Sequence, residues 1–220
     1  MTMALVGLLV LFVLVPSGFS LSCTKCFTGS SDICTGSSET CQPGYSCITS
    51  LSVTTLSSGS ASSFLTRGCA PNYKCNVAGS LTFADGRVSV SALCCNTDNC
   101  MTAIPTLPAA NSTLNNLSCS TCASATSDYC SSSNTLQCTG LETKCGRLSL
   151  STTGVFTSAS ITRGCATPSV CNLSENRMVT FEGSTLNSVV TAYCSNGGFN
   201  HHSSFYLLTF LAFFLFKFLF

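Results

Sequence analysis

The stretch L-S-C-T-K-C at residues 21–26 returns as L-S-C-S-T-C at residues 117–122, and T-R-G-C-A at residues 66–70 returns unchanged at residues 162–166. Eight cysteines recur in the same order, each displaced by 96 to 100 residues. They are Cys23, Cys26, Cys34, Cys41, Cys47, Cys69, Cys75 and Cys94, followed by Cys119, Cys122, Cys130, Cys138, Cys145, Cys165, Cys171 and Cys194. A repeat whose fixed points are cysteines predicts two tandem domains built on disulfides.

The residues between the cysteines predict strands. Alternating apolar runs at residues 46–56 and 64–70, and at 148–156 and 161–166, predict a long central hairpin in each copy. Asp85-Gly86 inside residues 81–90 is a strong hairpin signal, and residues 179–193 resemble it in the second copy. No helical period of useful length occurs between residues 21 and 196. The predicted class is all-β, small and disulfide-rich, because a core this small needs cross-links.

The amino-terminal end predicts a secretory signal peptide at residues 1–20. An apolar run extends from Ala4 to Val15, and small residues precede a cleavage site after Ser20. The run is too short for a membrane span, which needs about 20 apolar residues. Secretion in turn explains why 18 cysteines are present, because an oxidising compartment favours disulfides.

The carboxyl-terminal end predicts a glycosylphosphatidylinositol (GPI) anchor. Small residues at 195–198 precede a short polar spacer and an almost wholly apolar tail, Phe205–Phe220. We expect attachment at Asn196, with Ser195 or Gly197 as alternatives, and removal of residues 197–220. An uncleaved membrane tail and a soluble protein are the other two interpretations; Lys217 disfavours a span.

The remaining ectodomain is polar and has no charge excess. Its eight basic and eight acidic side chains cancel, because the ninth base is Lys217, so no nucleic-acid footprint exists. Residues 102–116, with Pro105 and Pro108, read as a linker. Three glycosylation sequons predict N-linked glycans at Asn111, Asn116 and Asn172; glycans beside the linker would keep it extended and exposed.

These features resemble the Ly6/uPAR family, whose fold is the three-finger domain. The opening Leu-x-Cys-x-x-Cys and the closing C-C-N-T-D-N-C at residues 94–100 carry the resemblance, and Cys-Cys followed by four residues and Cys is specific. The resemblance places the first domain at residues 21–101 and the second at residues 117–196. Sequence alone leaves many disulfide connectivities open, although neighbouring Cys94 and Cys95 are disfavoured as a pair.

The resemblance implies a disulfide pairing for each domain. The first domain would contain Cys23–Cys47, Cys26–Cys34, Cys41–Cys69, Cys75–Cys94 and Cys95–Cys100. The second would contain Cys119–Cys145, Cys122–Cys130, Cys138–Cys165 and Cys171–Cys194. Two departures from the family pattern stand out: the second domain lacks a counterpart of Cys95–Cys100, and Met101 occupies the position after Cys100 where the family usually has Asn.

No catalytic group is apparent. The ectodomain contains no His, because His201 and His202 lie in the predicted spacer, and the family pattern uses all the cysteines. We therefore predict no enzyme, no cofactor and no metal site. Arg67 and Arg163 precede Gly-Cys in both repeats, which favours a shared structural contact, such as a salt bridge or a contact with a carbonyl group, over ligand binding. The acidic residues are expected to be solvated: Asp32, Glu39, Asp85, Asp98, Asp128, Glu142, Glu175 and Glu182.

Binding is the remaining function. The architecture implies a GPI-anchored cell-surface glycoprotein that engages an extracellular protein ligand or a lateral membrane receptor, in adhesion, receptor modulation or gamete recognition. The loop tips at residues 54–63, 84–87, 152–160 and 182–187 are the expected contact surfaces. The alternative is a soluble phospholipase A2 inhibitor, because the two units joined through Pro-x-Leu-Pro also resemble the gamma-type inhibitors.

Overall fold

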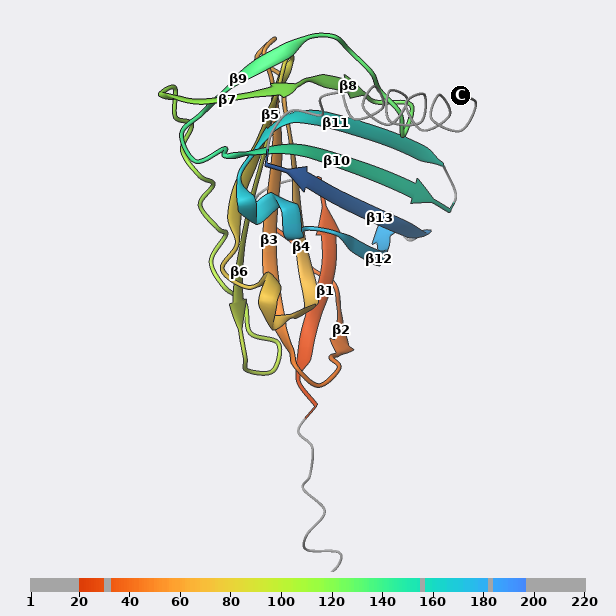
Figure 1. Ribbon diagram of the computed structural model, residues 1–220. Coiled ribbons are helices and arrows are strands. Elements are labelled where there is room, and N and C mark those ends of the chain that lie inside the picture. Colours follow the sequence, from red (N-terminus) through yellow and green to blue (C-terminus); the bar gives the residue numbers. More distant parts are fainter. Residues whose placement is uncertain (1–19, 30–32, 155–156, 182–183, 197–220) are drawn as a thin grey trace, which may run out of the picture.

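The computed structural model describes residues 20–29, 33–154, 157–181 and 184–196, and these form an all-β molecule (Figure 1). The predicted fold class is confirmed. The only helical elements in these ranges are two short 3₁₀ turns, η1 (Asn72–Lys74) and η2 (Pro168–Asn172). No helix among the described residues has the length and apolar character needed to cross a membrane. The predicted signal peptide, apart from Ser20, and the predicted apolar tail lie outside the described residues.

The first domain consists of three hairpins. The first joins β1 (Ser22–Thr28) to β2 (Ser37–Thr40), the second joins β3 (Tyr45–Leu56) to β4 (Ala61–Pro71), and the third joins β5 (Ala78–Phe83) to β6 (Gly86–Cys95). The strands lie in the order β5-β6-β3-β4-β1-β2. The long central hairpin and the Asp85-Gly86 turn are found where the sequence predicts them.

The second domain repeats this plan with one difference. Its central and third hairpins are β10 (Lys144–Thr153) with β11 (Ser158–Ala166), and β12 (Glu175–Phe181) with β13 (Ser184–Ser195). The strand equivalent to β1 is divided in two. β7 (Leu114–Ser120) pairs with β9 (Thr135–Thr139), whereas β8 (Cys122–Ser124) pairs with β11. The break falls at Thr121, which lies between β7 and β8.

Nine disulfides join the bases of the hairpins, and no cysteine is free. They are the pairs that the family resemblance implies: Cys23–Cys47, Cys26–Cys34, Cys41–Cys69, Cys75–Cys94, Cys95–Cys100, Cys119–Cys145, Cys122–Cys130, Cys138–Cys165 and Cys171–Cys194. Buried half-cystines form the centre of each base, with Cys23, Cys41 and Cys47 in the first domain. Two groups of three sulfur atoms lie close together there, but disulfide sulfur is not a thiolate and does not provide the usual cysteine ligand for a metal.

The two domains contact each other directly and are not joined by the linker alone. β11 of the second domain pairs with β5 of the first, so that ten strands follow one another in a continuous sheet, with β8 attached to β11. Figure 1 shows β10, β11 and β13 running steeply across the long strands of the first domain. The linker also differs from the exposed segment that we expected. Pro105 is buried, and Leu107 packs against Leu51 and Leu65 of the first domain.

Candidate functional site

The contact between the two domains is the best-ordered polar site of the described molecule. It consists of the β5–β11 pair and the side chains around it, and we call it the domain seam. In the strand register Cys165 lies opposite Thr82, and Ala166 lies opposite Leu81. Beyond the pair, the Ser80 carbonyl accepts the Thr167 backbone N–H at 2.9 Å. Backbone hydrogen bonds therefore connect the domains directly.

An apolar core lies beneath the seam. Leu81 and Phe83 from β5 pack with Ala166 and Val170 from the second domain, and Leu81 is only 1% exposed. Partly buried side chains from both domains surround this cluster: Val88, Val90, Leu148, Leu173 and Cys194. Burial of apolar surface is the main favourable term in association, so this core holds the domains together more strongly than the few strand hydrogen bonds do.

Glycines allow the two backbones to approach closely at the seam. A Cβ atom built on Gly164 would lie 1.9 Å from the carbonyl oxygen of Thr82. One built on Gly79 would lie 2.3 Å from Ser169 Oγ and 2.5 Å from Thr167 Oγ1. A backbone carbonyl cannot move aside as a flexible side chain can, so only glycine fits at position 164. The close approach of Thr82 therefore explains why the second domain needs glycine at this position of the T-R-G-C-A repeat.

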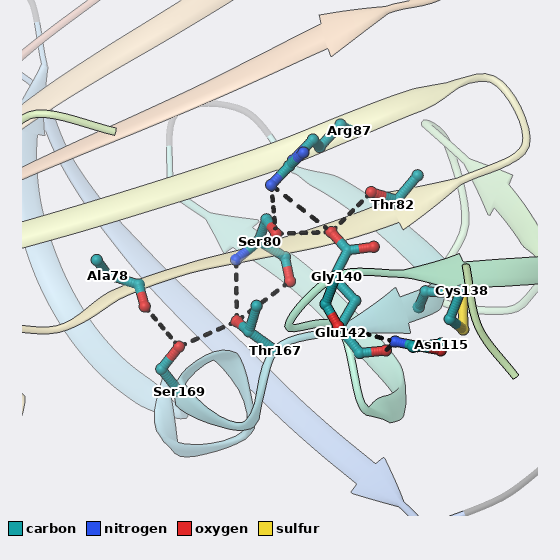
Figure 2. A network of polar contacts seen from close by, with 11 residues as sticks. Ala78, Ser80, Thr82, Arg87, Asn115, Cys138, Gly140, Glu142, Thr167 and Ser169 are labelled. Atoms are coloured by element: carbon teal, nitrogen blue, oxygen red, sulfur yellow. Dashed lines mark hydrogen bonds and ion pairs between the residues drawn. A yellow bond between two sulfur atoms is a disulfide. The ribbon is translucent and has the colours of Figure 1, made fainter. Parts of the chain in front are cut away.

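Glu142 is the centre of the polar network shown in Figure 2. Its Oε1 atom accepts hydrogen bonds from the hydroxyls of Ser80, at 2.6 Å, and Thr82, at 2.8 Å. Arg87 donates to Ser80 Oγ at 2.8 Å and places a guanidinium nitrogen 3.8 Å from the same carboxylate oxygen. A buried carboxylate is costly unless it is paired and hydrogen-bonded, and these three groups from the first domain stabilise the charge.

The second domain holds Glu142 in position. The Asn115 side-chain amide donates to the carbonyls of Gly140 and Glu142, both at 3.1 Å, and so fixes the turn before β10. Residue Glu142 is 3% exposed, and the expectation that it is solvated is therefore wrong. The sequence gives no signal of this burial, because the burying residues come from the other domain. Glu142 Oε2 and Arg87 Nε are buried without a hydrogen-bond partner.

Two further side chains complete the seam. Thr121, 2% exposed at the break between β7 and β8, accepts the Ala84 backbone N–H at 2.8 Å and donates to the Arg163 carbonyl at 3.2 Å. Ser169 donates to the Ala78 carbonyl at 2.7 Å. The tip at residues 84–87 was expected to meet an external ligand. The structure places the Ala84 backbone and the Arg87 side chain beside the second domain, and the expected contact of this tip with a ligand stays a prediction.

The other predicted contact surfaces differ in how exposed they are and in how much of each the structure describes. Residues 55–62 at the tip of the first central hairpin are all exposed, with Leu56 at 41%. In the corresponding tip of the second domain Thr152 is buried, residues 155–156 are not described, and Leu150 on β10 is 39% exposed. In the tip at residues 182–187, residues 182 and 183 lie outside the described residues, and the remaining four begin β13.

The repeated arginines do not form the salt bridge suggested by their sequence context. Arg67 Nη1 donates to the sulfur of Met101 at 2.9 Å. The Nε atoms of both Arg67 and Arg163 are buried without a hydrogen-bond partner. Among the described residues, ion pairs join Lys25 to Glu39, at 3.2 Å, and Arg87 to Glu142, at 3.8 Å.

The predicted modification sites are accessible where the structure describes them. Asn111, Asn116 and Asn172 are all exposed, as glycosylation requires, although glycans themselves stay a prediction. Asn196 accepts a hydrogen bond from Lys144 at the start of β10. Ser195 lies opposite Cys145 in the sheet register, so the chain ends its described course beside the disulfide base of the second domain. Gly197, Asp32 and Glu182 lie outside the described residues.

The family model described as the u-PAR/Ly-6 domain matches this chain twice, at residues 20–103 and 115–202. The chain belongs to the u-PAR/Ly-6 family. Members are typically extracellular or surface-anchored, and their domains are typically non-enzymatic binding domains. The chain is also similar to the crystal structure of mouse TEX101, with 19% sequence identity over 73% of this chain and 86% of that chain, and a TM-score of 0.32. A similarity of this level carries no inference about a ligand.

Proposed function

We propose that this chain is a GPI-anchored cell-surface glycoprotein whose two domains bind an extracellular protein as one rigid unit. The domain seam is the observation that supports this proposal. Because a shared sheet and a shared apolar core fix the domains relative to each other, surfaces from both can meet one partner without a further cost of ordering. The exposed tip at residues 55–62 is the first contact surface to test.

The ends of the molecule support an anchored orientation. Asn196 follows β13 beside the disulfide base, at the opposite end of the central hairpin from its tip. A lipid attached at Asn196 would therefore hold the base near the membrane and leave the tip of that hairpin directed away from it. An anchored protein has no cytoplasmic segment, so a signal would have to pass through a lateral membrane partner.

The first experiment is surface staining of cells that express the full chain, before and after phosphatidylinositol-specific phospholipase C. We expect loss of the surface signal and release of a chain ending near Asn196. Retention of the apolar tail in the surface protein would contradict the anchor. Protein found only in the medium, together with inhibition of a secreted phospholipase A2, would favour the soluble inhibitor.

A second experiment tests the binding surface. Oligomerised ectodomain is used to stain epithelial, leukocyte and germ cells, because one weak contact is then amplified by avidity. We expect Leu56→Ser to reduce staining at least about threefold, since an exposed apolar tip residue contributes contact area. The matched control is Leu150→Ser, a residue with a similar exposed fraction on the second central hairpin. Equal staining by both variants and the parent would exclude the first tip as a contact.

A further inference from the structure

A groove of about 670 Å³ lies on the first domain, beside the second. We call it the first-domain groove. Residues of β1, β2 and β4 form most of it, and Ser174 of the second domain contributes at one side. β1 and β12 are also in contact, although they lie near opposite ends of the strand order. The sheet therefore curves back on itself, and the groove is complete only when both domains are present.

One ion pair in the groove is already satisfied. Lys25 Nζ lies 3.2 Å from Glu39 Oε2, and the other oxygen of Glu39 accepts the Cys69 backbone N–H at 2.8 Å. Glu39 is therefore fixed against β4, with a side chain 29% exposed. It neutralises Lys25 but leaves the neighbouring arginine of β4 without an acidic partner.

Arg67 is that arginine. Its described contact is with the Met101 sulfur, a weak acceptor, and its Nε has no hydrogen-bond partner. Among the described residues no carboxylate is paired with Arg67. A guanidinium presents its donors in a planar fork that matches a carboxylate. Because Nε is buried, the capacity for such a ligand lies with the two terminal nitrogens, of which Nη1 contacts only a weak acceptor. Lys74, 8% exposed, also lines the groove.

Aromatic side chains accompany the cation. Tyr73 is 70% exposed at the groove, and Phe27 lines it while stacking on Phe64 with ring centroids 5.5 Å apart. A groove of this volume, lined by polar, aromatic and charged side chains, suits a short segment with mixed side chains. A sulfated glycan or an anionic membrane would instead be expected to meet a broad cluster of exposed cations.

We propose that the first-domain groove binds an acidic peptide segment of a protein partner, with a carboxylate of that segment paired to Arg67. The proposal rests on the proposed function, because it gives the chemistry of the extracellular partner. It assigns Glu39 a second role: as the carboxylate fixed in the groove, it repels an acidic ligand and limits affinity.

The test uses cells that express the full chain and two pooled sets of fluorescent decapeptides. One set carries Glu or Asp at alternate positions, and the other carries Gln or Asn there. We expect saturable binding of the acidic set only, weakening as salt is raised. Arg67→Gln should weaken binding about tenfold, because a charge-assisted pair is lost. Arg163→Gln, the same residue of the T-R-G-C-A repeat in the second domain, should change it less than about twofold.

Glu39→Gln should change binding in the opposite direction to a folding defect, because a folding defect weakens binding. The amide oxygen can still accept the Cys69 N–H, while the negative charge is removed, so we expect binding about threefold tighter. Equal losses in Arg67→Gln and Arg163→Gln, weaker binding by Glu39→Gln, or no preference for the acidic set would each overturn the proposal. So would binding of heparin or of phosphatidylserine vesicles in place of the peptides.

Failure here is distinguishable from failure of the proposed function. If the phospholipase treatment releases the protein but the acidic peptides do not bind, the anchored function stands and the inference about the groove is wrong. If the protein occurs only in the medium, the same titration is performed on the secreted protein, and a positive result preserves the groove without the anchor.

Discussion

The first domain has a fifth disulfide and three buried clusters of its own, whereas the larger apolar cluster of the second domain is shared with the first. Cys95–Cys100 staples the end of the first domain, and three buried clusters that include Cys23, Leu65 and Ile48 belong to it, with only Leu107 of the linker added. The cluster confined to the second domain consists of half-cystines with two partly buried leucines. Its larger apolar cluster contains Leu81 and Phe83 of the first domain. Among the residues whose burial the structure describes, two copies of one sequence pattern thus produce one domain with several clusters of its own and one whose larger apolar cluster is shared.

The same repeat position illustrates the difference. Lys25 is the fifth residue of L-S-C-T-K-C and lines the first-domain groove. Its counterpart, Thr121, is buried in the domain seam and divides the first strand of the second domain. Three residues before Cys47 the chain has Gly44, and three residues before Cys145 it has Glu142. The substitutions that distinguish the copies therefore assemble the seam in one copy and leave a groove in the other.

Deletion of one domain or the other should reveal the largest difference between the two domains. A chain lacking residues 21–116 should not reach the cell surface, because its Ala166 and Val170 lose their apolar cover. A chain lacking residues 102–194 retains the five disulfides of the first domain and should reach the surface in reduced amount. Flow cytometry of both, with the full chain as reference, measures this. Equal surface levels for the two deletions would contradict the asymmetry.

Leu81→Ala should give the largest effect among point substitutions. Truncation of a buried leucine costs about 3–4 kcal/mol, from lost transfer energy and a residual cavity. We expect this loss in the free energy of unfolding of the secreted ectodomain, with new protease cleavage between the domains. Ile48→Ala, 5% exposed in a cluster of the first domain that includes neither the linker nor the seam, is the control: it should destabilise comparably without separating the domains. Identical cleavage patterns would show that the seam does not depend on Leu81.

Glu142 variants test how much the charge and the hydrogen bonds of this carboxylate contribute to the stability of the domain seam. Glu142→Ala leaves the hydroxyls of Ser80 and Thr82 and the guanidinium of Arg87 without their acceptor, for a destabilisation of about 3 kcal/mol. Glu142→Gln keeps an acceptor oxygen and should cost about 1 kcal/mol. Chemical denaturation of the ectodomain measures both. A Glu142→Gln variant as unstable as Glu142→Ala would mean that the charge, and not the hydrogen bonding, dominates the seam.

Removal of Cys95–Cys100 should have a smaller effect than Leu81→Ala or Glu142→Ala and should make the first domain more like the second. The bridge closes a short loop, with a sequence separation of 5, so the chain-entropy model predicts a loss of only about 2 kcal/mol for Cys95→Ala with Cys100→Ala. Thermal unfolding of the double variant measures this. The comparison variant lacks Cys41–Cys69, separation 28, and should lose more. The opposite order would show that local strain outweighs loop entropy.

Much of the fold could be predicted because it depends on local signals. The alternating runs locate β3, β4, β10 and β11 within a few residues, and Asp85-Gly86 locates the third hairpin of the first domain. The position of the cysteines along these hairpins, read through the family resemblance, implies the pairs observed. By contrast, the solvated state expected for Glu142 is wrong, because its burial depends on residues of the other domain.

The sequence by itself determined the duplication, the all-β class, the hairpins and the family, since these rest on periodicity, turn chemistry and cysteine order along the chain. Only the tertiary structure decided that β5 pairs with β11, that a carboxylate is buried between the domains, and that Arg67 lies in a groove without an acidic partner. Each of these results joins residues far apart in the chain. Their free energies come from burial and charge pairing between surfaces that no local pattern encodes.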